Sequence, residues 1–335
     1  MHALVTGAAG FLGRAIVQQL CARGARVRGL VRRDDPTLKA WGVECVVGDI
    51  RDRQAVLAAC QGIDTVFHTA AVAGIWGPWQ HFYETNVLGT QHLLEACLKA
   101  GVRRLIFTSS PSVTFAGRDQ CGVDESAPYP RRWLAHYPHT KALAEQLVLK
   151  ANSPPTLLTC ALRPHLIWGP GDPHLIPRLL ERARRGRLWQ VGDGKNRIDA
   201  VYRDNAAAAH LAAADALTPT SPACGRAYFI SNGEPVLCWN WIGEILHKAG
   251  MPPVRRRIGL WPAYWMAAAC EGIWTCLRRP GEPPMTRFLA AQLGTSHYFD
   301  IRAACRDLGY RPQISMEEGM RRLQPWLETQ ARSGE

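Results

Sequence analysis

The chain has 335 residues, of which 47% are hydrophobic and 20% are charged, and it carries a formal net charge of +12. This composition is typical of a globular protein with an ample core, and it excludes fibrous and intrinsically disordered classes. The excess arginines come in pairs and short clusters without the interleaved aromatic residues of nucleic-acid motifs, so we expect no nucleic-acid partner.

Cysteine and histidine spacing argues against disulfide and metal chemistry. The eleven cysteines and eleven histidines are scattered, without C-x-x-C or H-E-x-x-H patterns. We therefore expect reduced, packed cysteines and no metal site. The first apolar run begins within a few residues of Met1, which leaves no room for a signal peptide before it, so we expect a cytoplasmic location.

A glycine-rich turn follows the first apolar run. Gly7, Gly10 and Gly13 stand three apart, before apolar residues at helical spacing. The pattern predicts a strand, a tight turn and a helix whose free N–H groups bind a pyrophosphate. We expect Gly7 to make the turn, Gly10 to let the phosphates approach and Gly13 to let the helix pack on the strand, with Phe11 and Leu12 completing the cofactor loop.

The residues after the second expected strand, 26–31, decide which cofactor fits. A carboxylate at the end of that strand would bind a ribose 2′-hydroxyl, but Arg32 and Arg33 stand there instead. A guanidinium can pair with a 2′-phosphate, so Arg32 favours NADP(H) over NAD(H). The alternative is that Asp34 or Asp35 serves the ribose.

Three further strands are expected at 43–48, 64–71 and 103–108, each separated from the next by a helical segment. Strands that alternate with helices predict an α/β fold with a doubly wound parallel sheet. Ligands bind such sheets at the carboxyl ends of the strands. Asp49 and Ile50 follow the first of these three strands, and we expect them to contact the adenine.

Two polar residues interrupt these apolar patterns. His68 lies within the strand 64–71, where a packed core histidine is a better expectation than a catalyst. Asn86 lies in the helical segment 79–100 and must find a hydrogen-bond partner if it is buried.

The chemistry-bearing residues follow the strand at 103–108. Ser109 and Ser110 come at its carboxyl end, and Tyr137 and Lys141 stand four apart at the start of a helix, so they share one face. A phenol ordinarily titrates near pH ~10, and a neighbouring ammonium favours the phenolate. We expect Tyr137 to transfer a proton, Lys141 to lower its pKa, and Ser110, or failing it Ser109, to hydrogen-bond the substrate oxygen.

Four motifs together resemble an extended short-chain dehydrogenase/reductase, and within that superfamily the 3β-hydroxysteroid dehydrogenase family: T-G-A-A-G-F-L-G, F-T-S-S-P-S-V, Y-P-H-T-K and L-R-P-H-L-I-W-G-P-G-D. The resemblance covers nearly the whole chain. It implies a Rossmann fold and hydride transfer between a nicotinamide and a secondary alcohol carbon. It also implies that Lys141 holds the nicotinamide ribose, and we expect a homodimer.

Two branches of the family are similar to this chain. The runs at 112–119 and 163–165 favour sterol-4-carboxylate 3-dehydrogenases (decarboxylating), and the runs at 169–188 and 281–288 favour bacterial 2-alkyl-3-oxoalkanoate reductases of long-chain olefin synthesis. Both branches imply a lipid with a hydroxyl or ketone β to a carboxylate. We favour the sterol branch, with the reductase as the alternative.

A substrate carboxylate requires a cation. Arg131, Arg132 and the arginines from Arg178 onward are all candidates for this role.

The expected domains are a dinucleotide-binding Rossmann domain at 1–167 and, at 168–335, mainly a smaller, mixed substrate-binding cap. Segments near 197–217 and 226–232 are expected to return to the first domain.

The segment 258–277 is long and apolar and contains three tryptophans. Pro262 and Glu271 interrupt it, which argues against a spanning helix. We expect it to line the substrate or the core; the alternative is a helix that lies at a membrane interface.

Two other functions are compatible with the motifs. A nucleotide-sugar epimerase or dehydratase uses the same serine, tyrosine and lysine, but such dehydratases add an acid beside the serine, where this chain has Pro111. A cofactor-sensing regulator would have no reason to keep both Tyr137 and Lys141.

Overall fold

A parallel sheet of seven strands organises the larger part of the structure, a computed structural model that describes residues 1–332. All paired neighbours in this sheet run parallel. In spatial order the strands are β12 (Arg226–Ile230), β7 (Leu158–Pro164), β5 (Arg104–Thr108), β4 (Thr65–His68), β1 (His2–Thr6), β2 (Arg26–Val31) and β3 (Glu44–Val47). The sheet confirms the predicted fold class and the five expected strands, and it adds β7 and β12.

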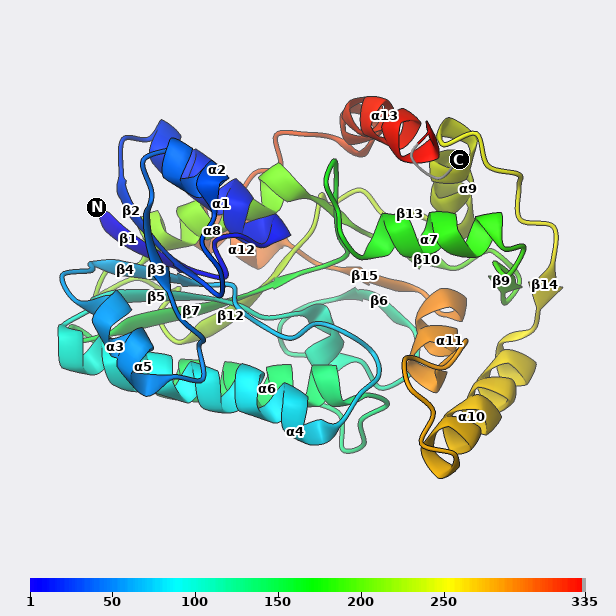
Figure 1. Cartoon of the computed structure of the whole chain (residues 1–335), viewed down its shortest axis with the longest axis horizontal. Helices are drawn as coiled ribbons and strands as arrows, with labels where there is room; N and C mark the ends of the chain where they lie inside the picture. The colour runs from blue at the N-terminus through cyan, green and yellow to red at the C-terminus, as the bar shows by residue number, and fades with distance from the viewer. Residues whose placement is uncertain (333–335) are drawn as a thin grey trace.

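Helices cover both faces of this sheet (Figure 1). One face carries α1 (Phe11–Ala22), α8 (Arg203–Ala216) and α12 (Arg302–Leu308), and the other carries α3 (Arg53–Cys60), α5 (Gly89–Ala100) and α6 (His136–Lys150). Successive side chains of a strand point to opposite faces. Ala3 and Val5 of β1 therefore pack under α1, whereas Leu4 packs on the other side. The central strands β1, β4, β5 and β7 are buried on both faces, which is why they are largely apolar.

Short elements connect the strands to these helices: α2 (Pro36–Ala40), α4 (Trp79–Tyr83), the π-helical turn η1 (Glu84–Leu88) and the 3₁₀ turn η2 (Pro111–Thr114). The expected helix at 79–100 is present as α4, η1 and α5 in succession. π-helical turns are rare and occur frequently at functional sites. Here η1 contains Asn86.

The smaller part is built around a mixed sheet with the strand order β13 (Val236–Leu237), β10 (Arg197–Ile198), β15 (His297–Phe299) and β6 (Gln120–Val123). Two short pairs join β11 (Val201–Tyr202) to β8 (Ile167–Trp168), and β14 (Arg257–Ile258) to β9 (Gln190–Val191). Its helices are α7 (Leu175–Arg184), α9 (Cys238–Lys248), α10 (Leu260–Cys276), α11 (Arg287–Gly294) and α13 (Met316–Arg332).

Aromatic side chains fill the core of the smaller part. Trp168 is fully buried, with ring centroids 5.6 Å from Trp241 and 5.5 Å from Tyr202. Segments of the chain also pass back to the larger part, because α8 packs on α1 and β12 forms an edge of the main sheet, whereas β10 pairs within the mixed sheet. The domain boundary at residue 167 stays a prediction.

The apolar segment at 258–277 forms the unbroken helix α10. The expectation that Pro262 interrupts it is wrong, because Pro262 is the third helical residue, where a missing N–H breaks no intrahelical hydrogen bond. No helix within residues 1–332 is long and apolar enough to cross a membrane. The expectation of a core or substrate-lining helix is also wrong, because most of the side chains of α10 are exposed or half-buried and none lines the large cavity described next.

Candidate active site

The glycine loop between β1 and α1 is shaped by backbone contacts. Gly7 has φ +69°, and a Cβ there would lie 3.0 Å from Ala70 Cα. A Cβ on Gly13 would lie 2.2 Å from the carbonyl oxygen of Gly7, so only glycine lets α1 approach the turn. Gly10 caps α1 without a side-chain hydrogen bond, and the first turn holds no acidic residue. The N–H groups at this helix end are therefore suited to a phosphate.

This loop opens into a cavity of about 1010 Å³ that runs along the carboxyl ends of the main-sheet strands. The cavity brings together every residue that the sequence predicts for catalysis or cofactor binding. Its lining includes Gly7, Gly10, Phe11, Leu12, Gly13, Arg32, Asp49, Ile50, Ser109, Ser110, Tyr137 and Lys141.

The acidic residues after β2 are held by other side chains. Asp35 accepts a hydrogen bond from Arg14 Nη2 at 2.5 Å and caps α2 through the backbone N–H of Leu38 at 3.1 Å. Asp34 pairs with Lys39 at 2.7 Å. Arg32 lines the cavity directly after the end of β2. Asp34 and Asp35 line the same cavity, but the carboxylates considered for the ribose are thus already engaged by Lys39 and Arg14.

Asp49 stands at the end of β3, where the adenine is expected. It accepts hydrogen bonds from the backbone N–H of Arg51 at 2.9 Å and from Arg51 Nε at 3.0 Å. The hydrogen bonds from Arg51 lower the pKa of Asp49, with a smaller contribution from the nearby Arg32 charge. This carboxylate is therefore ionised and fixed in place, with Ile50 buried beside it.

Tyr137 and Ser110 meet at the other end of the cavity. Tyr137 is the second residue of α6, and Ser110 caps η2, with its Oγ accepting from Ser112 N at 3.2 Å. Burial raises the pKa of Tyr137 to about 12, and a hydrogen bond with Ser110 opposes that shift. The expectation that the pKa of Tyr137 lies below its usual value is therefore wrong in this structure, because desolvation of the phenolate outweighs the hydrogen bond with Ser110.

Lys141 lies one helical turn after Tyr137. Its Nζ donates a hydrogen bond to the carbonyl oxygen of Thr108 at 2.6 Å and lies 4.0 Å from the ring centroid of Phe107. Burial lowers the pKa of Lys141 to about 7, and the Glu145 carboxylate partly opposes this. The lysine is thus held against the end of β5, beside the serines.

A buried ion pair joins α6 to β7. Glu145 receives a bidentate contact from Arg163, with Nη2 to Oε1 at 2.7 Å and Nε to Oε2 at 3.0 Å. Tyr129 donates its hydroxyl to the same carboxylate at 2.6 Å. Because breaking a buried pair leaves an uncompensated charge, this network fixes the helix that carries Tyr137 and Lys141.

Asn86 and His68 are both buried and hydrogen-bonded. Asn86 accepts from Val72 N at 2.8 Å and donates to Val72 O and Thr140 Oγ1, both at 3.1 Å. It thus joins the cavity-lining loop after β4 to α6. His68 lies between Thr6 and Thr90, and burial lowers its pKa to about 3, so it is a neutral packing residue as predicted.

The end of the cavity beyond Tyr137 is lined by residues that the sequence analysis did not single out: His81, Thr85, Pro164, Leu166, Asp172, His174 and Leu175. Leu166 has φ +40°, a strained conformation for a branched residue and one that recurs at functional sites. A positive φ has no signature in a single sequence. The arginines considered for a substrate carboxylate, Arg131, Arg132 and Arg178, are not among the lining residues.

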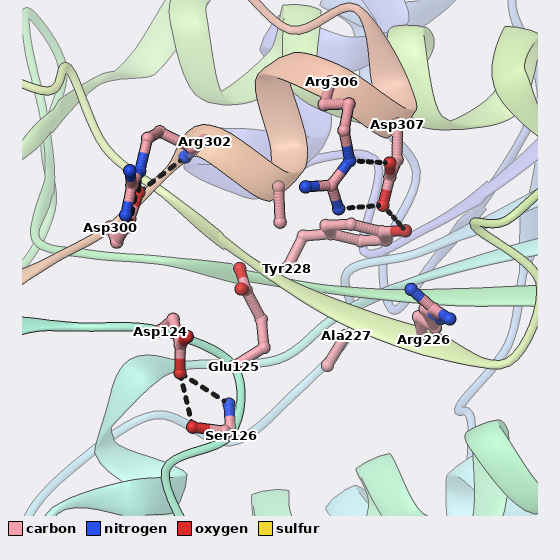
Figure 2. Close-up of a pocket in the computed structure, with 11 residues that line it drawn as sticks. Asp124, Glu125, Ser126, Arg226, Ala227, Tyr228, Asp300, Arg302, Arg306 and Asp307 are labelled. Atoms are coloured by element: carbon pink, nitrogen blue, oxygen red, sulfur yellow. Dashed lines mark hydrogen bonds and ion pairs between the residues drawn. The ribbon is translucent and has the colours of Figure 1, made fainter.

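A second hollow, of about 460 Å³, lies at β12, α12 and the loop after β6 (Figure 2). Figure 2 shows Arg302 held by Asp300 and Arg306 held by Asp307. None of the predicted site residues lines it. The large cavity, which holds the predicted catalytic and cofactor-binding residues, therefore remains the candidate active site.

No group of three or more histidine, cysteine or acidic side chains within residues 1–332 could hold a metal ion. The candidate site consists of the N-terminus of α1, which is suited to a phosphate, and the cluster of Ser110, Tyr137 and Lys141 in the same cavity.

Comparison with known proteins places this site in a family. The model of the 3-beta hydroxysteroid dehydrogenase/isomerase family matches residues 4–259. A 2-alkyl-3-oxoalkanoate reductase of Stenotrophomonas maltophilia is 49% identical over 326 residues, covering 96% of this chain and 98% of that protein. A mouse sterol-4-alpha-carboxylate 3-dehydrogenase, decarboxylating, is 35% identical over 326 residues, covering 95% of this chain and 88% of that protein.

The fold is also similar to solved structures. MoeE5 in complex with UDP-glucose and NAD superposes with a TM-score of 0.73 over the whole of both chains, at 28% sequence identity. The family match, the named relatives and the cavity agree: this chain belongs to the 3-beta hydroxysteroid dehydrogenase/isomerase family and is an NAD(P)-dependent oxidoreductase.

Proposed function

We propose that this enzyme reduces the 3-ketone of a 2-alkyl-3-oxoalkanoate to the 3-hydroxyl, with NADPH as the preferred cofactor. The relative named for this reaction is 49% identical to the chain, whereas the relative named for the sterol reaction is 35% identical over a similar length. These identities reverse the order in which the sequence motifs ranked the two branches.

The two branch motifs differ in how many of their residues line the cavity, and this difference supports the choice of substrate. The run at 163–165 favoured the sterol branch, but Arg163 is buried against Glu145 and His165 against Asp199, and only Pro164 of this run lines the cavity. The run at 169–188 favoured the reductase branch, and three of its residues, Asp172, His174 and Leu175, line the cavity. Residues that touch the substrate determine specificity, whereas buried pairs maintain the fold.

Tyr137 can act as the proton donor of the proposed reduction. When bound, the cofactor supplies the hydride for the ketone carbon. With a pKa of about 12, the Tyr137 phenol keeps its proton at neutral pH and can donate it to the ketone oxygen. Ser110 would donate a second hydrogen bond to the same oxygen and thereby stabilise its developing charge.

The preference for NADPH rests on the residues after β2. The glycine loop has the shape of a phosphate cradle, because a Cβ on Gly13 would overlap Gly7. Arg32 can pair with a 2′-phosphate, while Asp34 and Asp35 are engaged by Lys39 and Arg14 and are less able to accept from a ribose hydroxyl.

The reaction can be tested directly with purified enzyme. One sample receives a long-chain 2-alkyl-3-oxoalkanoate with NADPH, a second the same acid with NADH, and a third a 3β-hydroxysterol-4-carboxylate with oxidised cofactor. We expect the hydroxy acid, identified by mass spectrometry, in the first sample at the highest kcat/KM. The Y137F variant is the control for enzymatic turnover.

Turnover of only the sterol, with release of carbon dioxide, would contradict the proposal and restore the sterol branch. Turnover of a nucleotide sugar but of neither lipid would support the epimerase alternative, which has in its favour the likeness to a protein bound to UDP-glucose.

A further inference from the structure

The outward face of α10 is apolar. Trp261 and Trp265 are each 68% exposed, Leu277 directly after the helix is 61% exposed, and Ile273 and Met266 are 47% and 43% exposed. At about 3.6 residues per turn, these positions fall on one side of the helix. An exposed tryptophan is uncommon, and a contiguous apolar face marks an interaction site.

The opposite face of α10 carries the only charged residue of the helix. Glu271 is buried and accepts hydrogen bonds from Arg287 N at 2.7 Å and from Arg287 Nε at 2.6 Å. Ala263 and Ala267 on the same face are fully buried against the protein. The polarity of α10 is therefore the reverse of that of an ordinary surface helix, which turns its apolar side inward.

Exposed arginines flank the apolar face at both ends. Arg255, Arg256 and Arg257 precede α10, and Arg278 and Arg279 follow it; all five are exposed. Tryptophan at the level of the headgroups and basic residues at the ends of the helix are typical of a helix that lies in the interface of an anionic membrane.

We propose that α10 docks the enzyme on the surface of an anionic lipid bilayer, with Trp261 and Trp265 inserted among the lipids and the flanking arginines at the headgroups. A second copy of this chain suits the face less well, because two such helices facing each other would bring two sets of five arginines together. A helix of 17 residues lies on the bilayer and does not span it.

Docking through α10 would bring the membrane close to the substrate end of the cavity. Glu282, in the turn after α10, pairs with Arg178 of α7 at 2.9 Å and lies beside the loop after β4, since a Cβ on Gly74 would be 3.9 Å from Glu282 Oε1. Val72 and Ala73 of that loop line the cavity. Figure 1 shows α10 and α11 at the end of the molecule far from β2 and α2, and the turn between β2 and α2 contains Arg32, the arginine proposed to bind the cofactor.

Vesicle sedimentation tests this proposal without cofactor or substrate, so its result does not depend on the proposed reaction. The full chain is mixed with vesicles of phosphatidylcholine alone, or of equimolar phosphatidylcholine and phosphatidylglycerol. We expect binding to the anionic vesicles that weakens with added salt, and little binding to the neutral ones.

Three variants refine the test. W261S/W265S should lower the partition coefficient at least about tenfold, because the inserted apolar area is lost. R278Q/R279Q should lower it by about fivefold per charge on anionic vesicles only. L98S removes a leucine of α5 that is 51% exposed and should change nothing. Circular dichroism and thermal unfolding confirm that each variant is folded.

The proposal is overturned if the wild type binds neither kind of vesicle or binds both kinds equally, or if binding survives W261S/W265S. Light scattering, which measures the oligomeric state, tests whether a second copy of this chain covers the apolar face instead of a membrane. A wild-type dimer that W261S/W265S converts to a monomer, without vesicle binding, would assign the face to a second copy of this chain.

Discussion

The two ends of the large cavity are built in different ways. The cofactor end consists of turns directly after β1, β2 and β3, so each lining residue follows its strand within a few positions. The end beyond Tyr137 is assembled from α4, the loop after β4, the residues after β7 and the start of α7, which are far apart in the chain. The first end depends on backbone geometry, and the second on how separate elements pack. Substitutions at the substrate end should therefore leave cofactor binding nearly unchanged, and substitutions at the cofactor end should leave the shape of the substrate end nearly unchanged.

The largest expected effect lies where the two ends meet. Replacing Tyr137 with phenylalanine removes the proton donor and should lower kcat by about 10²–10⁴-fold, as loss of a general acid does. The dissociation constant for NADPH, measured by fluorescence, should change little, because the cofactor loop is untouched. If turnover survives, the role of Tyr137 is wrong; if cofactor binding is also lost, the two ends are not independent.

The next effect is a dependence of stability on pH that comes from Lys141. Its pKa in the folded protein is about 7, against an ordinary 10.5, so between these values the unfolded chain binds more protons than the folded chain. The free energy of unfolding should therefore rise with pH across this window, by on the order of a few kcal/mol, and fall as the pH is lowered through it.

The K141M variant isolates this contribution, because other groups also titrate in the same range. Urea unfolding of the wild type and of K141M should give a difference that grows from the low to the high end of the window. A difference that does not change with pH would show that Lys141 is solvated and ordinary.

At the cofactor end, Gly13→Ala should destabilise the fold by about 1–3 kcal/mol, because its Cβ would overlap a backbone oxygen that cannot move freely. It should also weaken NADPH binding by displacing the loop. Gly243→Ala in α9 is the matched control, since its Cβ meets nothing within 4 Å, and it should stabilise by up to about 1 kcal/mol. Equal behaviour of the two variants in thermal unfolding would refute the close-packing argument.

The smallest expected effect concerns cofactor choice. Arg32→Gln should weaken NADPH binding by about tenfold to a hundredfold, the value of a charge-assisted hydrogen bond, and leave NADH binding nearly unchanged. Arg23→Gln, which alters an exposed pair with Asp215, is the control. Equal losses for both cofactors would mean that Arg32 does not contact the 2′-phosphate.

The substrate end shows where motif reasoning reached its limit. The R-P-H run looked informative, but its arginine and histidine are buried in ion pairs, and only Pro164 reaches the cavity. Leu166 and His174 line the cavity without any local pattern that distinguishes them from neighbouring loop residues. The pKa of Tyr137 was predicted in the wrong direction, because helical spacing shows that an ammonium lies nearby and does not show how deeply the phenol is buried.

The sequence by itself determined the parallel sheet, the cofactor loop and the grouping of Ser110, Tyr137 and Lys141, because strand and helix periodicity and glycine spacing are local properties of the chain. Only the tertiary structure decided which residues complete the substrate end and that α10 turns Trp261 and Trp265 outward. Both depend on packing between separate elements, such as the contact of Glu271 in α10 with Arg287 in α11. The free energy of such contacts cannot be inferred from the local residue pattern of a single segment.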